Sequence, residues 1–276
     1  MFNTKNILSR IIGLGLLASL GLVALLLVSA PASAATSPTL SAVGSYSVLA
    51  GSIVTNTGAT TMPGDLGVSP SIGVPPHVTG FPPGVVGPPG TIHDADANAA
   101  AAQSDNTAAF AFIDQGCNIT YPGTKDLVGE NLVPGVYCAD AFELSGTLTL
   151  SGSGVWIFKS ASTLITSGTA NVVGGDPCNV WWRVVSSATL GTNTSLLGNI
   201  LALTSISLNT GATLNGRALA QTGAVTMDDN TITTGVCVPG GGTATTVPTL
   251  NEWGTIIFML LAGLGSVYYL RKYRRV

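Results

Sequence analysis

An internal repeat restricts what this chain of 276 residues can fold into more than any other feature. Residues 198–202 (GNILA) recur 18 positions later as residues 216–220 (GRALA). Residues 189–191 (TLG) recur as residues 207–209 (SLN), also 18 positions on, and again as residues 226–228 (TMD) after 19 more. A period of this length is typical of one coil of a β-solenoid with three short strands.

The residues around the repeat favour strands rather than helices. Residues 38–73 and 127–236 are rich in Thr, Ser, Val, Leu and Gly, in short alternating runs that Gly, Asn or Asp usually ends. Many short strands with frequent turns indicate an all-β fold. A helical repeat would need a longer period and few β-branched residues. A β-sandwich is the alternative, but it would not give such regular spacing.

One segment departs from this pattern and predicts a helix over about residues 94–115. It is rich in Ala and contains no Gly or Pro, Asp94 and Asp96 lie near its start, and Gly116 follows it. One face would carry mostly small side chains suited to close packing on a sheet: Ala95, Ala99, Ala102, Ala109 and Ile113. The Pro-rich stretch at residues 74–90 is expected to be an irregular loop.

Charge is scarce and unevenly placed. Charged residues make up 8% of the chain, against about 25% in ordinary domains. Between residues 35 and 246 there are four basic and twelve acidic residues, a balance that a phosphate backbone would repel. We therefore expect no nucleic-acid partner.

The N-terminus has the organisation of an export signal. Lys5 and Arg10 precede an apolar run, and Ala32-Ser33-Ala34 supplies the small residues that signal peptidase requires. Residues 1–34 are therefore expected to be removed, with Ala35 as the first mature residue. An uncleaved membrane anchor is the alternative, because the apolar run is long for a signal.

The C-terminus, residues 247–276, is also tripartite. Residues 247–254 (VPTLNEWG) precede an apolar run, and a basic cluster from Arg271 closes the chain. This tail resembles the IPTL-CTERM sorting signal, although Val247 stands where that family usually has Ile. The resemblance implies a transmembrane segment, a transient membrane anchor and recognition by an exosortase-like protease. A plain single-helix anchor is the alternative, and both place the middle of the chain outside the cytoplasm.

The cysteines fit an oxidising compartment. Cys117, Cys138, Cys178 and Cys237 are too widely spaced for a zinc site. Two disulfides are expected, and three connectivities are possible. Sequence order favours Cys117–Cys138 and Cys178–Cys237, with four buried free thiols as the alternative.

The chain offers little for catalysis, and we expect neither an enzyme, nor a metal site, nor a cofactor. The adjacent pair Asp228-Asp229 precedes Asn230 and is typical of a polar turn. His77 lies in the Pro-rich stretch, and His93 is expected to cap or pack against the start of the helix. No triad pattern or repeated Asp motif is present.

The middle of the chain, residues 35–246, contains several ordered motifs: residues 51–58 (GSIVTNTG), 64–70 (GDLGVSP), 80–84 (GFPPG), 132–137 (LVPGVY) and 186–219. With these motifs the chain resembles the ice-binding-like (DUF3494) family over about residues 40–236. The resemblance implies a right-handed β-solenoid, triangular in section, with one long helix alongside. It also implies ice or ordered water as the partner.

A ladder of Thr side chains could meet ice without a pocket. Residues 57–60 and 210–213 share the pattern Thr-Gly-Ala-Thr, and the 18-residue period places Thr192 and Ser195 one coil before the second copy. Asp228 and Thr231 follow one coil later, and Asp228 departs from Thr. The predicted ice-binding residues are Thr57, Thr60, Thr166, Thr169, Thr192, Ser195, Thr210, Thr213 and Thr231, with Thr147 outside the ladder.

Two functions therefore remain open for an exported protein of the cell envelope or the extracellular space. One is ice binding through a flat Thr-rich face. The other is a structural or adhesive role at the cell surface, without ice activity.

Overall fold

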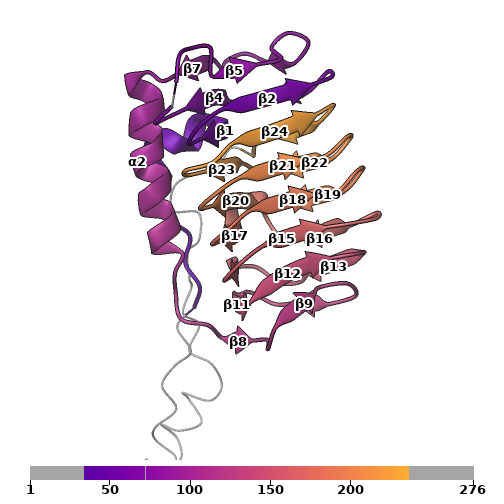
Figure 1. The fold of residues 1–276 in the computed structure, drawn as a ribbon. Coiled ribbons are helices and arrows are strands. Elements are labelled where there is room, and N and C mark those ends of the chain that lie inside the picture. Colours follow the sequence, from indigo (N-terminus) through magenta and orange to yellow (C-terminus); the bar gives the residue numbers. More distant parts are fainter. Residues whose placement is uncertain (1–33, 72, 236–276) are drawn as a thin grey trace, which may run out of the picture.

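The computed structural model describes residues 34–71 and 73–235, which form a stack of short strands beside one helix (Figure 1). The strands form three sheets of nine, eight and eight members, and neighbouring strands run parallel. Each complete coil contributes one strand to each sheet. The expected all-β solenoid is confirmed, and the sandwich is excluded.

The first sheet, sheet A, lies next to the helix and has the order β7-β4-β1-β23-β20-β17-β14-β11-β8. Its strands are β1 (Tyr46–Ala50), β4 (Asp65–Val68), β7 (Ile92–Asp94), β8 (Ile119–Thr120), β11 (Gly135–Ala139), β14 (Trp156–Ser160), β17 (Val180–Val184), β20 (Asn199–Ala202) and β23 (Ala218–Ala220).

The other two sheets follow sheet A in each coil. Sheet B contains β5 (Val78–Thr79), β2 (Val54–Thr57), β24 (Val225–Asp228), β21 (Ile206–Leu208), β18 (Ala188–Leu190), β15 (Leu164–Thr166), β12 (Ala141–Leu144) and β9 (Thr124–Asp126). Sheet C contains β10 (Asn131–Leu132), β13 (Thr147–Leu150), β16 (Asn171–Gly174), β19 (Ser195–Leu197), β22 (Thr213–Asn215), β25 (Thr231–Thr233), β3 (Thr61–Met62) and β6 (Val85–Val86).

The order of coils in the stack differs from their order in the chain. The helix α2 (Ala97–Phe112) carries the chain from β7, at one end of sheet A, toward β8 at the other end (Figure 1). Later coils then stack from β8 back toward the first end of sheet A, until β23 pairs with β1. The last described coil therefore packs directly on the first. Two short 3₁₀ helices, η1 (Ser41–Ser45) and η2 (Pro177–Asn179), flank β1 and β17.

The helix is shorter than predicted. Asp96 is its N-cap, and the carboxylate accepts a hydrogen bond of 2.8 Å from the backbone N–H of Ala99. Ala95 lies before this cap with φ of 58° and is exposed, so its predicted place on the packing face is wrong. His93 contacts the cap as expected, with Nδ1 lying 2.7 Å from a carboxylate oxygen of Asp96.

The Pro-rich stretch is more regular than an irregular loop. It contains β5 and β6, two strands of two residues each. His77 is buried beside β5, where its Nδ1 lies 2.7 Å from a carboxylate oxygen of Asp94. The stretch therefore completes the solenoid coil at this end of the stack.

The central strands of sheet A are buried on both faces, because α2 and the segment before β1 cover the outer face. Ala102, Ala109 and Ile113 of the helix side pack with Trp181 and Leu201 of the sheet. Parallel strands that are buried on both faces consist of continuous hydrophobic runs. β11, in which all five residues are buried, has this pattern. The central strands of sheet A are therefore covered, whereas the residues of its end strands β7 and β8 are half-buried or exposed.

The interior of the solenoid contains a stack of aromatic rings. Tyr137, Phe158 and Trp182 come from neighbouring strands of sheet A, and the Phe158 and Trp182 rings stack with centroids 4.2 Å apart. The indole N–H of Trp182 donates to the carbonyl of Leu197 at 3.0 Å. These side chains are among the largest in the core that the three sheets enclose.

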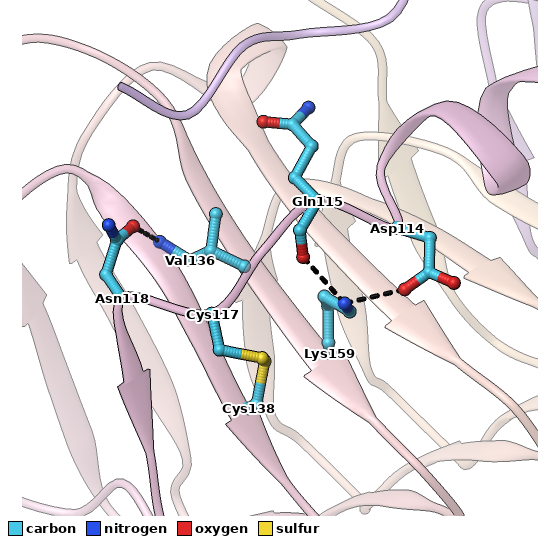
Figure 2. The surroundings of a disulfide bond; sticks show 7 residues. All are labelled: Asp114, Gln115, Cys117, Asn118, Val136, Cys138 and Lys159. Carbon is cyan, nitrogen blue, oxygen red and sulfur yellow. Dashed lines mark hydrogen bonds and ion pairs between the residues drawn. A yellow bond between two sulfur atoms is a disulfide. The ribbon is translucent and has the colours of Figure 1, made fainter. Parts of the chain in front are cut away.

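The exit of the helix is tied to sheet A by a disulfide between Cys117 and Cys138 (Figure 2). This confirms the first predicted pairing. Lys159 donates to the carbonyl of Gln115 and pairs with the carboxylate of Asp114 at 2.6 Å. The hydrogen bond from Lys159 to Asp114, together with the charge of Arg183, lowers the pKa of Asp114. Cys178 is also disulfide-bonded, and Cys237 lies outside the described residues.

Replacing Trp182 with Ala tests how much this core contributes. Trp182→Ala should lower the free energy of unfolding by about 3–5 kcal/mol, because it leaves a cavity and removes the ring stack. Chemical denaturation followed by circular dichroism measures the change. Phe112→Ala is the control, since that ring is half exposed; equal losses for the two variants would contradict this view of the core.

Candidate functional site

Several of the predicted ladder residues lie at the corner where sheet B turns into sheet C. Thr57 ends β2, and Thr192 and Thr210 lie two residues after the ends of β18 and β21; all three are exposed. Ser195, Thr213 and Thr231 begin strands of sheet C and pair in register. The predicted set therefore divides between two sheets instead of forming one surface.

Two of the predicted residues are buried and cannot contact ice. Thr60 is 0% exposed, because the turn after β2 has one residue more than the turn after β24. Thr61 consequently takes the outward position beside Thr231. Thr166 is 2% exposed, because it ends β15 with its side chain inward, where its hydroxyl bonds to that of Thr194.

The predictions for Thr169 and Thr147 depended on the register of the longer coils. Asn171, and not Thr169, pairs with Ser195, so Thr169 is an exposed turn residue outside the row. Thr147 pairs with Asn171 and therefore belongs to the row that it was expected to lie outside. A period of 18 residues holds for only part of the stack, and longer coils displace the pattern.

Buried polar side chains hold the corner in shape. The amide of Asn230 donates to the carbonyls of Asn209 and Ala212, at 2.9 and 3.0 Å, and accepts from the backbone N–H of Asp228. One coil away, the hydroxyl of Thr194 donates to the carbonyl of Gly191 at 2.8 Å. Polar groups that are satisfied in this way fix the turns that join the two sheets.

Sheet B carries a second row that the sequence analysis missed. Five hydroxyl side chains point outward from neighbouring strands in direct register, and we call them the hydroxyl row: Thr79, Thr55, Thr226, Ser207 and Thr189. The hydroxyls of Thr226 and Ser207 lie 3.0 Å apart. Under the row, Val54, Val225, Ile206 and Ala188 are buried.

The surroundings of the hydroxyl row are flat and weakly polar. Ala224, Ser205 and Ser187 precede the row residues by two positions, on the same side of their strands. Ile165 continues the row beyond Thr189 and is 42% exposed, and Ile53 beside Thr55 is 36% exposed. Small side chains and methyl groups therefore surround the hydroxyls.

Charge begins where the row ends. Glu143 pairs with Ile165 on one side and with Asp126 on the other. Burial acts to raise the pKa of Asp126, but hydrogen bonds from Ser145 and the backbone outweigh it and lower the pKa. Lys125 pairs with Glu130 at 2.5 Å, which raises the pKa of Lys125. The lowered pKa of Asp126 and the raised pKa of Lys125 keep both groups ionised at neutral pH, so the β9 end of sheet B is charged.

One carboxylate lies beside the hydroxyl row itself. Asp228 pairs with Thr57 and accepts a hydrogen bond from the hydroxyl of Thr210. Its neighbour Asp229 lies in the turn after β24 with φ of 51°, and its carboxylate accepts from the backbone N–H of Ala59, in the turn of the neighbouring coil. The two acids expected to form a polar turn therefore differ: Asp229 shapes the turn, whereas Asp228 ends a strand of sheet B.

The described residues hold no deep cleft near these rows. A shallow hollow of about 250 Å³ lies at the corner, lined by Thr192, Thr210, Thr226, Asp228 and their neighbours. Within residues 34–71 and 73–235, no group of three or more His, Cys, Asp or Glu side chains is arranged to hold a metal ion. In the same part of the chain, no helix is long and apolar enough to cross a membrane.

The internal repeat itself indicates the hydroxyl row. Thr189, Ser207 and Thr226 are the first residues of the repeated triplets TLG, SLN and TMD. The second residue of each triplet is buried, so alternation along the strand places the first outward. The predicted ladder relied on Thr-x-x-Thr spacing at the turns, so it did not include these strand residues.

A solenoid with an uncovered face of aligned hydroxyls defines a protein that binds an extended surface rather than a small molecule in a pocket. The sequence profile of the family described as Ice-binding-like matches residues 48–233. The chain belongs to this family.

Named relatives agree with this assignment. The chain is 44% identical to an ice-binding protein of Nostoc sp. (strain HG1) over 212 residues, which cover 73% of this chain and 76% of that protein. It is 38% identical to the crystal structure of an ice-binding protein from an Antarctic biological consortium, with a TM-score of 0.68 over 75% of this chain and 96% of the other. The ice-binding protein of Antarctomyces psychrotrophicus gives 38% identity and a TM-score of 0.66, over 72% of this chain and 98% of the other.

Removing the Asn230 amide tests the support of the corner. Asn230→Ala should lower the free energy of unfolding by about 1–3 kcal/mol, because it removes the side-chain donor to the buried carbonyl of Ala212 and one of two donors to the carbonyl of Asn209. Thermal melting of the variant and of Asn215→Ala, an exposed control on sheet C, measures the difference. An Asn230→Ala protein as stable as the control would show that the corner does not need this amide.

Proposed function

We propose that this protein binds ice through the hydroxyl row of sheet B. The observation that carries the proposal is the alignment of five Thr and Ser side chains on a sheet that α2 leaves uncovered. Membership of the Ice-binding-like family and similarity to ice-binding proteins of other organisms support the same ligand.

The chemistry of the row suits a lattice of water. Neighbouring strands lie about 4.7–4.8 Å apart, so the row repeats its hydroxyls at a spacing close to that of the ice lattice. A Thr methyl excludes disordered water, while the hydroxyl anchors an ordered one. The buried strand residues beneath the row keep it rigid, so the protein loses little conformational entropy when it binds.

Charge sets the limits of the proposed contact. An ionised side chain keeps its own hydration shell, and removing that shell is expensive. Glu143 and Asp126 therefore bound the contact at the β12 end of sheet B, and the ice-contacting part extends from β5 to β15. Sheet A takes no part, because α2 covers it.

The two terminal segments lie outside the described residues, and we include them in the proposal as an export route. The disulfide at Cys117 suits an oxidising compartment. Removal of residues 1–34 by signal peptidase, and sorting through residues 247–276 by an exosortase-like protease at the membrane, would place the protein outside the cell. The parallel connections between strands also favour the right-handed sense of the coil.

A bulky ring on the hydroxyl row should abolish the flat contact. Thr226→Tyr should reduce recrystallisation inhibition and thermal hysteresis several-fold, while stability changes by only about 0.5 kcal/mol because the site is exposed. Thr107→Tyr, on the outer face of α2, is the matched control. Full activity in Thr226→Tyr would refute the proposal, and an unmutated protein without ice activity would favour the adhesive role.

Removing the charge beside the row should have the opposite effect. Asp228→Asn should increase thermal hysteresis at a fixed protein concentration, because it removes a hydration shell at the edge of the contact. Asp229→Asn makes the same change in net charge one residue away, within the turn, and should leave activity nearly unchanged. Equal effects of the two substitutions would point to net charge instead of position.

A further inference from the structure

The column of inward side chains in sheet B ends in a charge. Its members pair in register along the stack and are apolar until the last strand: Val78, Val54, Val225, Ile206, Ala188, Leu164, Phe142 and Lys125. The six members between the two ends are at most 1% exposed. Lys125 of β9 therefore occupies the position that a core residue has in the other coils.

An ion pair holds this Lys at the end of the core. Its ammonium lies 2.5 Å from a carboxylate oxygen of Glu130, in the turn before β10, and 5.1 Å from the centroid of the Tyr121 ring. The Tyr121 ring packs against the core. The side chains of Lys125 and Glu130 are 26% and 33% exposed, so the charges meet water while the apolar stem of Lys125 continues the column.

The lower end of the stack, formed by β8, β9 and β10, has the features of an assembly surface (Figure 1). In the part of the chain that the structure describes, each of these strands pairs on one side only. Ile119 continues the aromatic stack beyond Tyr137 and is 43% exposed, and Val128 and Val133 are 49% and 62% exposed. Unpaired strand edges beside exposed apolar side chains are a template for adding another chain.

The opposite end of the stack repeats the polar arrangement. Asp94 ends β7 in register with Val68 and Ala50, which are buried in the core, so it also takes an inward position in an end coil. Its carboxylate accepts from the backbone N–H of His77 at 2.9 Å and lies 2.7 Å from Nδ1 of that ring. Phe81, from the turn between β5 and β6, also packs against the core at this end.

Both end coils therefore place a polar pair where the inner coils have apolar side chains. Charged residues make up only 8% of the chain, so two such pairs at core positions are a marked departure from its composition. Polar end coils keep repeat proteins soluble, and inward-pointing charges prevent edge strands from pairing. A second molecule stacked on the lower end would have to remove water from Lys125 and Glu130, which is costly.

We propose that the Lys125–Glu130 pair closes a self-association surface at the lower end, and that the partner of this surface is the lower end of a second copy of the chain. The surface is self-complementary, since each copy presents Ile119, Val128 and Val133 beside unpaired strand edges. The upper end does not compete for it, because the His77–Asp94 pair remains there. Loss of the Lys125–Glu130 pair therefore gives a closed dimer with two-fold symmetry. This inference does not depend on the ligand of sheet B.

Analytical ultracentrifugation of the full chain in detergent tests the proposal. Lys125→Leu/Glu130→Leu leaves the net charge unchanged and should double the protein mass at concentrations where the wild-type protein is a monomer. Adding Ile119→Asp to this variant returns a charge to the same end, through sheet A, and should restore the monomer. Glu143→Leu is the matched control, because it removes an outward charge from the neighbouring strand β12, and it should remain a monomer.

Several outcomes would overturn the proposal. One is a folded Lys125→Leu/Glu130→Leu protein that stays monomeric, and another is a dimer of this variant that Ile119→Asp does not dissociate. A wild-type dimer that Ile119→Asp dissociates would show that the pair does not close this end. An open series of larger masses would contradict the two-fold pairing. Lys125→Met/Glu130→Gln keeps the length of both side chains, and it carries the test if circular dichroism shows that the first variant does not fold.

Discussion

Hydrogen bonds between successive coils fix where each outward side chain lies, because the strands of sheets B and C pair in register with their parallel neighbours. Ser207 lies beside Thr226 and Ser195 beside Thr213 for this reason. A slip of one residue would turn these hydroxyls into the core and bring buried residues such as Met227 to the surface. The rows on sheets B and C therefore exist only while the register holds.

Two features of the sequence protect that register. The aromatic stack of Phe158 and Trp182 fills the interior, so neighbouring strands cannot slide without opening a cavity. At the corner, Thr194 and Asn230 satisfy backbone groups that a shifted turn would leave without partners. The helix then occupies the outer face of sheet A, which leaves sheets B and C as the surfaces where function can lie.

The sequence allowed the solenoid, the single helix and the Cys117–Cys138 disulfide to be predicted, because each has a local signature. It also placed Thr213 and Thr231 correctly in one row, since the coils that carry them are 18 residues long. The predictions for Thr60 and Thr166 were wrong, because an extra turn residue shifts the pattern at Thr60 and a longer coil shifts it at Thr166. No local signal in the sequence reveals the extra residue or the longer coil.

The packing of the last described coil on the first was not predictable from the repeat. Local periodicity gives the length of a coil, but it does not show which coils are neighbours. The pairing of β23 with β1 depends on the helix returning the chain to the opposite end of the stack. That pairing brings Thr226 beside Thr55 and so completes the hydroxyl row.

Contact between the hydroxyl row and ice can be measured residue by residue. In solid-state NMR of the labelled protein frozen in ice, magnetisation should pass from ice protons to Thr55, Thr226 and Thr189 faster than to Thr107 on the outer face of α2. Equal or faster transfer to Thr107 would contradict ice binding through sheet B.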